Sequence, residues 1–142
     1  MKTVQQLLAT KSTLVYSVVP AASVLDALQL MMEKNISSLL VQENGALLGI
    51  FTERDYARKI VLQGKSSANT LIEEVMTAEL TTVKLSDSIE NCMKIMTDRR
   101  IRHLPVMENN EVRGLVSIGD VVKFVIEDQK QTINALESYI SS

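Results

Sequence analysis

Residues 83–120 read VKLSDSIENCMKIMTDRRIRHLPVMENNEVRGLVSIGD, and residues 18–55 read VVPAASVLDALQLMMEKNISSLLVQENGALLGIFTERD. Aligned without a gap, ten of the 38 pairs are identical, against about two or three expected by chance. Several other pairs keep their chemical character, as Thr52 and Ser117 do. The chain therefore holds an internal duplication. Two copies are too few for an open solenoid, so we expect them to pack against each other around a pseudo-two-fold axis.

Both copies predict the same order of elements, β-α-β-β-α, and therefore an α/β fold class. In each, a β-rich entry precedes a serine and a run of apolar residues at helical spacing, followed by two short strands and a second helix. Asn and Gly between the two strands favour a hairpin, because both tolerate positive φ. The expected strands are 14–18, 36–41 and 47–52 in the first copy and 81–85, 101–107 and 112–117 in the second; the closing helices begin near Glu53 and Gly119.

The expected boundaries place the first repeat at 10–63 and the second at 74–128. The stretch 63–70 is the one linker-like segment, and its shortness predicts a single structural module. The flanking segments 1–9 and 129–142 are predicted to be helical with one apolar side. They could cap the module or pack on a second subunit.

The composition excludes several classes of protein. With 46% hydrophobic residues and a net charge of −2, the chain is typical of a soluble globular domain. One Cys and one His cannot build a zinc site, and near-neutral charge with few aromatic residues argues against nucleic-acid binding. No signal core or membrane span is apparent, so we expect a cytoplasmic protein. Cys92 is interpreted as a small core residue, because it lies at an apolar helical position.

The duplicated polar residues carry the functional hypothesis. Each second strand ends in Gly-φ-φ-[Thr/Ser]-x-x-Asp, with Thr52 and Asp55 in the first copy and Ser117 and Asp120 in the second. A hydroxyl three residues before an acid is a helix-capping pattern, and capping alone would explain both motifs. The same geometry offers a carboxylate to a vicinal diol beside a helix N-terminus that favours phosphate. Both interpretations can hold together.

A basic corner in the second copy offers a place for an anion. Arg102 and His103 follow Arg99 and Arg100, and a planar guanidinium beside an imidazole suits phosphate. The alternative is a solvated corner between helix and strand. The first copy has serines at 37–38 instead, so the two copies differ electrically. Further charge could come from the second helices, at Arg54, Arg58 and Lys123.

Together these motifs resemble a tandem pair of CBS (cystathionine β-synthase) domains, also called a Bateman module. The resemblance covers about residues 10–128 and is carried by the duplication, Val75-Met76-Thr77, the run 101–106 from Ile101 to Val106, and the two Gly-to-Asp motifs. It is closest to the stand-alone bacterial type, which has no attached enzyme or transporter. It implies an antiparallel pair of repeats with two clefts between them that bind AMP, ADP, ATP, S-adenosylmethionine or NAD(H), without a metal, and a flat homodimer.

The resemblance also implies roles for individual residues. Asp55 and Asp120 would hold ribose hydroxyls, with Thr52 and Ser117 beside the ribose and phosphate. Arg102 and His103 would face the anionic end. The remaining candidates are Ile36 or Ile101 against Met76 and Thr77 around the adenine, Pro105 within the run 101–106, and Arg54, Arg58 and Lys123 for extra phosphate. Serines at 37–38, and Leu40 in place of a proline, predict unequal clefts.

The leading hypothesis is a non-catalytic nucleotide sensor that signals a conformational change to an unidentified regulated protein, with no nucleic-acid or membrane partner. Two alternatives belong to other classes. One is a nucleotide-processing enzyme with His103 as acid or base, against which stands the lack of a second catalytic group. The other is a dimerisation scaffold whose ligand sites are vestigial, with both hydroxyl–Asp pairs kept as helix caps.

Overall fold

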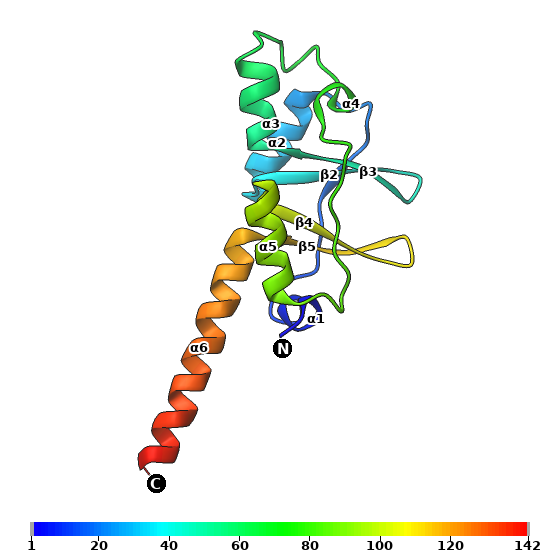
Figure 1. Ribbon diagram of the computed structural model, residues 1–142. Helices are drawn as coiled ribbons and strands as arrows, with labels where there is room; N and C mark the ends of the chain where they lie inside the picture. The colour runs from blue at the N-terminus through cyan, green and yellow to red at the C-terminus, as the bar shows by residue number, and fades with distance from the viewer. Residues whose placement is uncertain (1, 142) are drawn as a thin grey trace. The chain divides into compact units, whose positions relative to one another are not determined.

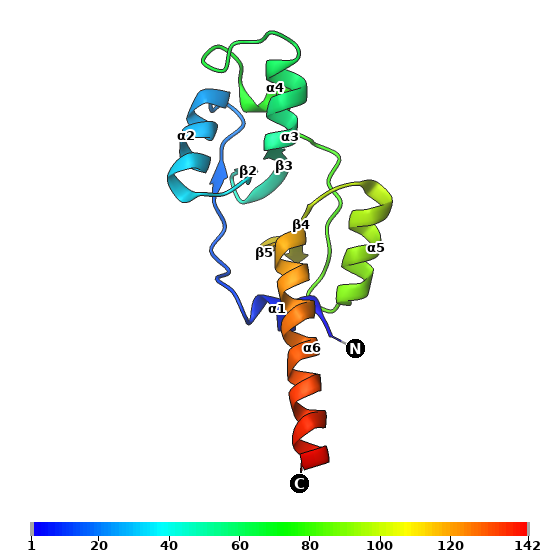
Figure 2. The same ribbon diagram turned by 90° about the vertical axis from the view of Figure 1, so that its left-hand side faces the viewer.

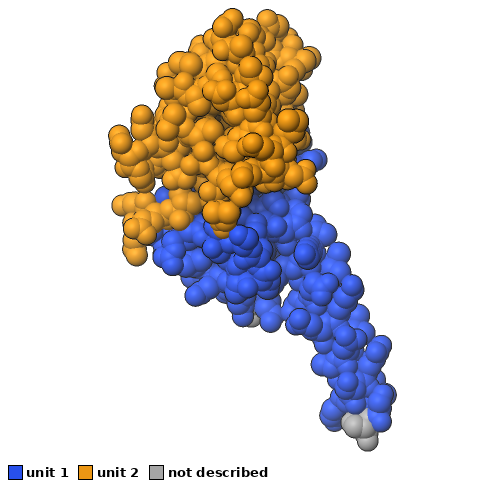
Figure 3. Space-filling model, turned by 180° about the vertical axis from the view of Figure 1, so that it is seen from behind, with its two compact units in different colours: residues 1–13, 82–108, 113–142 blue, residues 14–81, 109–112 orange. Residues whose placement is uncertain are grey.

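The computed structural model describes residues 2–141, so Met1 and Ser142, the outermost residues of the two expected flanking segments, lie outside it. The chain divides into two compact units, coloured separately in Figure 3. Unit 1 comprises Met1–Thr13, Thr82–Glu108 and Arg113–Ser142, and unit 2 comprises Leu14–Thr81 and Asn109–Val112. Unit 2 therefore contains the first copy of the duplication, and unit 1 contains the second copy except for residues 109–112; each unit also contains a segment from outside its copy.

Unit 2 is built on a three-stranded sheet of order β1-β2-β3. β1 runs parallel to β2, and β2 pairs antiparallel with β3 from Ser38↔Thr52 to Glu43↔Ala46. Asn44 and Gly45 both have positive φ, which confirms the predicted hairpin turn. The elements of this unit are β1 (Ser17–Val18), α2 (Val24–Lys34), β2 (Ser38–Glu43), β3 (Ala46–Thr52), α3 (Glu53–Tyr56), the π-helical turn η1 (Ala57–Val61) and α4 (Ile72–Val75).

Unit 1 repeats this plan on a two-stranded sheet, β4-β5. The expected entry strand at 81–85 is reduced to a parallel bridge between Val83 and Val106, in which the Val83 amide donates to the Pro105 carbonyl at 3.0 Å. The turn that joins β4 to β5 again has positive φ, at Asn109 and Asn110, although residues 109–112 are grouped with unit 2. The helices and strands here are α1 (Val4–Leu8), α5 (Ile89–Arg99), β4 (His103–Glu108), β5 (Glu111–Ser117) and α6 (Ile118–Ser141), labelled in Figure 1.

The C-terminal flanking segment is helical, and it is continuous with the closing helix of the second repeat. It is the end of α6, a single helix that begins at Ile118 and continues to Ser141. Figures 1 and 2 show α6 continuing well past α1 and α5, the two other helices of unit 1. Within residues 2–141, none of the helices combines the length and apolar character that crossing a membrane requires.

Each core is completed by a short helix from outside its own copy. α1 contributes Val4, Leu7 and Leu8 to the core of unit 1, and α4 contributes Ile72 and Val75 to that of unit 2. The other buried residues of these two core clusters are Val83, Ile89, Cys92, Met96, Leu104, Val106, Val116 and Val121 in unit 1, and Val24, Ala27, Met31, Leu39, Val41, Phe51 and Ile60 in unit 2.

α1 and α4 are bound by equivalent backbone hydrogen bonds. The Val4 amide donates to the Asp87 carbonyl at 2.9 Å, and the Ile72 amide donates to the Ala22 carbonyl at 2.8 Å. Ala22 and Asp87 are 65 positions apart, like the aligned copies, whereas Val4 and Ile72 are 68 apart. The structural repeat thus extends beyond the copies seen in the sequence, after a three-residue change of offset.

Two motif glycines allow this close packing. A Cβ at Gly49 would lie 2.7 Å from Met76 Sδ and 3.0 Å from the Thr77 carbonyl oxygen. One at Gly114 would lie 3.0 Å from Leu8 Cδ2. Any larger residue would push the segment after α4, or α1, away from its strand.

We predict that Gly49→Ala destabilises the protein by about 1–3 kcal/mol, because the added methyl group meets backbone and sulfur at less than contact distance. Urea unfolding measures the change. Gly119→Ala is the control, since its Cβ would lie 3.7 Å from Ser117 Oγ, an ordinary contact at the start of a helix. Equal unfolding midpoints for the two variants would show that the close approach at Gly49 carries no constraint.

Candidate functional site

The two hydroxyl–Asp motifs form the helix caps that their spacing predicted. In unit 2, Asp55 N donates to Thr52 Oγ1 at 3.1 Å and Thr52 N donates to Asp55 Oδ2 at 3.0 Å. In unit 1, Asp120 N donates to Ser117 Oγ at 3.1 Å and Ser117 N donates to Asp120 Oδ2 at 2.9 Å. Each acid is thereby fixed in the first turn of its helix, where the helix dipole favours negative charge.

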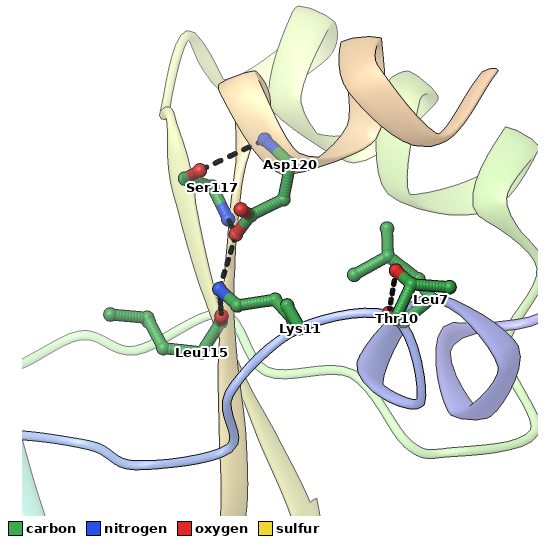
Figure 4. Close-up of polar contacts among 6 residues, drawn as sticks. All are labelled: Leu7, Thr10, Lys11, Leu115, Ser117 and Asp120. Carbon is green, nitrogen blue, oxygen red and sulfur yellow. Dashed lines mark hydrogen bonds and ion pairs between the residues drawn. The ribbon is translucent and has the colours of Figure 1, made fainter. Parts of the chain in front are cut away.

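Asp120 is also bound by a lysine from the N-terminal segment. Lys11 Nζ lies 2.6 Å from Asp120 Oδ2 and donates at 3.0 Å to the carbonyl oxygen of Leu115 (Figure 4). Both side chains remain partly exposed, Lys11 at 31% and Asp120 at 26%. The ion pair therefore lies where water, or a ligand, can reach it.

The electrostatics of this corner are set by burial and by neighbouring charges. Burial acts to raise the pKa of Asp120, but the hydrogen bonds from Lys11 and Ser117 and the charge of Lys11 outweigh it and hold that pKa below its usual value. Burial is the main cause that lowers the pKa of His103, opposed by Asp120 and assisted by Arg102 and Lys11. Near neutral pH the corner thus combines a carboxylate, two fixed cations and a neutral imidazole.

Asp55 in unit 2 is held differently. Its Oδ1 accepts from Thr77 Oγ1 at 3.0 Å and lies 3.1 Å from Lys59 Nζ, which also donates to the Val75 carbonyl at 2.9 Å. Its Oδ2 accepts from the amide and the hydroxyl of Thr52. Four donors therefore saturate this carboxylate, whose side chain is only 10% exposed.

The two acids are consequently unequal as binding groups. A diol needs two free acceptor positions on a carboxylate. At Asp55 these positions are filled by donors of its own unit: one amide, two hydroxyl groups and one ammonium group. Asp120 accepts from Ser117 and Lys11 through one oxygen and is more exposed. The geometry favours the acid of unit 1 as the one that can exchange partners.

The remaining predicted site residues fall into two groups by unit. Unit 1 brings Arg102 to the start of α6, where its carbonyl accepts from the Ile118 amide at 2.9 Å. In unit 2, Thr77 is the predicted adenine-side residue that contacts a predicted acid. Of the others, Arg54, Arg58 and Lys123 are exposed; Ile36, Ile101 and Met76 pack partly buried against their cores; and Pro105 is buried in β4.

Sequence reasoning missed two lysines. Lys11 has no counterpart within the aligned copies, and its partner Asp120 is 109 positions away. Lys59 follows Asp55 at the i,i+4 spacing typical of helical ion pairs, a signal that could have indicated it. Lys59 lies within η1, and such π-turns are often found at functional positions.

The sole cysteine behaves as the sequence predicted. Cys92 is fully buried in the core of unit 1. Burial, with a smaller contribution from Asp87, raises the pKa of its thiol to about 11, so it is an unreactive thiol at neutral pH. Within residues 2–141, no three His, Cys, Asp or Glu side chains gather as ligands for a metal ion.

The sequence matches the model of the CBS domain family twice, over residues 12–62 and 72–127. The chain therefore belongs to the CBS domain family and carries a tandem pair of these domains. A similar curated protein is the CBS domain-containing protein CBSX3, mitochondrial, of Arabidopsis thaliana, 43% identical over 123 residues, which are 83% of this chain and 60% of that protein. The chain thus spans about three fifths of the length of that relative.

Solved structures agree with this assignment. A putative signal-transduction protein with CBS domains from Burkholderia ambifaria MC40-6 is 49% identical, with a TM-score of 0.87 over 90% of this chain and 96% of that one. The CBS domain pair of protein MJ0100, crystallised with 5′-methylthioadenosine and S-adenosyl-L-methionine, is 25% identical, with a TM-score of 0.79 over 90% of this chain and 98% of its own. The mixed α/β fold predicted from the sequence is confirmed.

We predict that Lys11→Met raises the pKa of Asp120, because the variant removes both a hydrogen bond and a charge that stabilise the carboxylate while leaving its burial in place. Carboxyl NMR titration measures the change. A pKa below the ordinary value favours folding above the unfolded-state pKa, and that contribution is lost as pH falls through the folded-state pKa. Lys11→Met should therefore reduce the loss of stability on acidification.

Lys2→Met is the matched control for that titration, since Lys2 pairs with Asp128 at 3.5 Å elsewhere on α6. It should leave the pKa of Asp120 unchanged. If both variants move that pKa equally, the contact between Lys11 and Asp120 does not determine it.

Proposed function

We propose that this protein is a non-catalytic sensor that binds an adenosine nucleotide of the AMP, ADP, ATP or NAD(H) type through the Asp120 corner of unit 1. The observation that carries the proposal is the capped carboxylate of Asp120 beside exchangeable Lys11, with Arg102 and His103 adjacent. The solved MJ0100 pair, which holds two adenosine compounds, supports this class of ligand.

The binding step begins with an exchange of partners on Asp120. Two ribose hydroxyls donate to the carboxylate and displace the ammonium of Lys11, while Ser117 N keeps the side chain in its capping position. A charge-assisted hydrogen bond is stronger than a neutral one, so the diol recovers part of what the broken ion pair loses. The displaced ammonium then becomes available to a second group on the same ligand.

The charge of the corner selects the rest of the ligand. Lys11 and Arg102 are cationic, and Arg102 can meet a phosphate through two parallel N–H donors. Burial lowers the pKa of His103, so its imidazole is neutral near pH 7, and an approaching phosphate dianion would favour its protonated form. A phosphorylated adenosine therefore suits this corner better than S-adenosylmethionine, whose sulfonium adds positive charge.

The surroundings of His103 favour binding over catalysis, and those of Asp55 indicate which unit binds. His103 is the single imidazole of the chain, and its charged neighbours are Asp120, Arg102 and Lys11, none of which is a nucleophile prepared by a base. The saturated Asp55 of unit 2 supports a structural role for that acid, so the vestigial-site hypothesis fits unit 2 while unit 1 remains competent.

The proposed conformational change would involve the segment of chain that contains Lys11. Lys11 lies in the segment that joins α1, in unit 1, to β1, in unit 2. Its release from Asp120 and Leu115 frees that connector, so a ligand with different affinities for the tied and released states shifts the population between them. We propose a cytoplasmic homodimer as the working unit and a regulated protein as the reader.

We predict that AMP, ATP or NAD raises the melting temperature in proportion to ln(1 + [L]/Kd), with stabilisation of about 2.7 kcal/mol at a hundredfold excess over Kd. Asp120→Asn should abolish the shift. The amide oxygen still caps α6, but it carries no charge and accepts a diol poorly. Differential scanning fluorimetry and calorimetry give the readout.

Asp128→Asn is the matched control, because it also removes an ion pair between α6 and an N-terminal lysine. It should bind nucleotide like the parent protein. The proposed function fails if no adenosine compound shifts the melting temperature at millimolar concentration, or if Asp120→Asn binds normally.

We predict that Arg102→Ala weakens binding of AMP at least tenfold and leaves binding of adenosine unchanged, because the guanidinium meets only the phosphate. Isothermal calorimetry with both ligands measures the difference. Arg99→Ala, an exposed arginine at the end of α5, should affect neither ligand. Equal losses for AMP and adenosine in Arg102→Ala would contradict a phosphate role.

A further inference from the structure

The outer part of α6 leaves large apolar side chains exposed to solvent. Among the helices, α6 contacts α1 and α5, and its buried or half-buried positions end at Asp128. From residue 129 to residue 141 every side chain is exposed. Several of these exposed side chains are large and apolar, among them Ile133 at 53%, Leu136 at 58% and Ile140 at 81%.

These exposed apolar residues follow a heptad pattern. From Val122 onward, five of the six large exposed apolar residues lie at 122, 126, 133, 136 and 140, and Gln129 fills the one remaining place in the alternation of four and three; the sixth, Tyr139, flanks this stripe. Residues 126, 133 and 140 are all Ile and correspond to heptad position a, while Val122, Gln129 and Leu136 correspond to d. A stripe of this kind is the seam of a coiled coil, not the broader face of a helix that packs on a globular core.

The outer part of α6 would gain stability from such a partner. Its thirteen exposed residues have no burial to support them, and helical segments of about 12–15 residues are marginal in water without packing. Its side-chain charges argue against a lipid surface: beyond Ile126 there are one lysine and three acidic residues, whereas interfacial helices are rich in Lys and Arg. The seam is therefore suited to another helix.

We propose that the outer part of α6 pairs with α6 of a second copy of this chain as a parallel, in-register two-stranded coiled coil. Ile at a with Leu at d is the combination that favours two parallel strands. In this register Gln129 faces Gln129 of the second copy, and each amide can donate to and accept from the other. A self-matched polar layer also fixes the register, as polar seam residues do.

The antiparallel arrangement is disfavoured by the same residues. It would place Gln129 opposite Ile133, leaving a buried amide without a partner, and Lys130 opposite Lys130. Its gain would be exposed pairs between Lys123 and Glu137, and exposed ion pairs contribute little. The parallel register sets no like charges against each other, because Lys130 then faces Val125 and Glu137 faces Thr132.

Cysteine cross-linking in the full-length protein tests this pairing directly. Leu136→Cys lies at position d, so mild oxidation should link two chains through this residue and shift most of the protein to a disulfide dimer on a non-reducing gel. Gln131→Cys, equally exposed but on the outer face of α6, is the control and should stay monomeric on the gel. The protein without an added cysteine is a second control: its own Cys92 is buried, so oxidation should not link two chains through it.

The outcomes separate the alternatives. Efficient linking of Leu136→Cys alone supports the parallel seam. Linking only when Ile126→Cys and Leu136→Cys proteins are mixed would show an antiparallel pair and overturn the proposal. Equal linking of Leu136→Cys and Gln131→Cys, or none from either, would also overturn it. As a second readout, Ile133→Glu should lower helical circular dichroism of the full chain, while Asn134→Glu should not.

Discussion

Each unit depends on one close approach between a strand and a segment from outside its own copy. Val4, Leu7 and Leu8 complete the core of unit 1, and Ile72 and Val75 complete that of unit 2. These helices have only five and four residues, so they have no stability of their own and exist because their apolar side chains are buried. The approach is possible because glycine stands at the contact point in both units.

The same constraint delivers the polar groups of the site. In unit 2 the segment that passes Gly49 continues directly into Thr77, whose hydroxyl reaches Asp55. In unit 1 the equivalent segment passes Gly114 at Leu8 and continues to Lys11, whose ammonium reaches Asp120. The packing of these segments therefore also positions the polar donors, because a segment displaced from its strand would move its donor away from the acid.

Much of this could be predicted because it is local. The hairpins with positive φ at the Asn and Gly turns and the capping box of Thr52 and Asp55 depend on residues close in sequence. The role of α1 was not predictable from the aligned copies, because its offset is 68 residues where theirs is 65. The role of Lys11 was not predicted either, because no local pattern indicates a contact between residues 109 positions apart.

The divergence of the two copies explains how a duplicated motif can serve two purposes. Both acids belong to a capping box, which needs one carboxylate oxygen, one hydroxyl oxygen and two backbone amides. At Asp55 the remaining capacity is taken by Thr77 and Lys59 in a buried setting, so the acid strengthens its unit and little else can reach it. At Asp120 that capacity is met by one partly exposed ammonium, which solvent screens and a stronger partner can replace. Because capping preserves the position of the carboxylate, the exchange of partners proposed for Asp120 would leave the start of α6 intact.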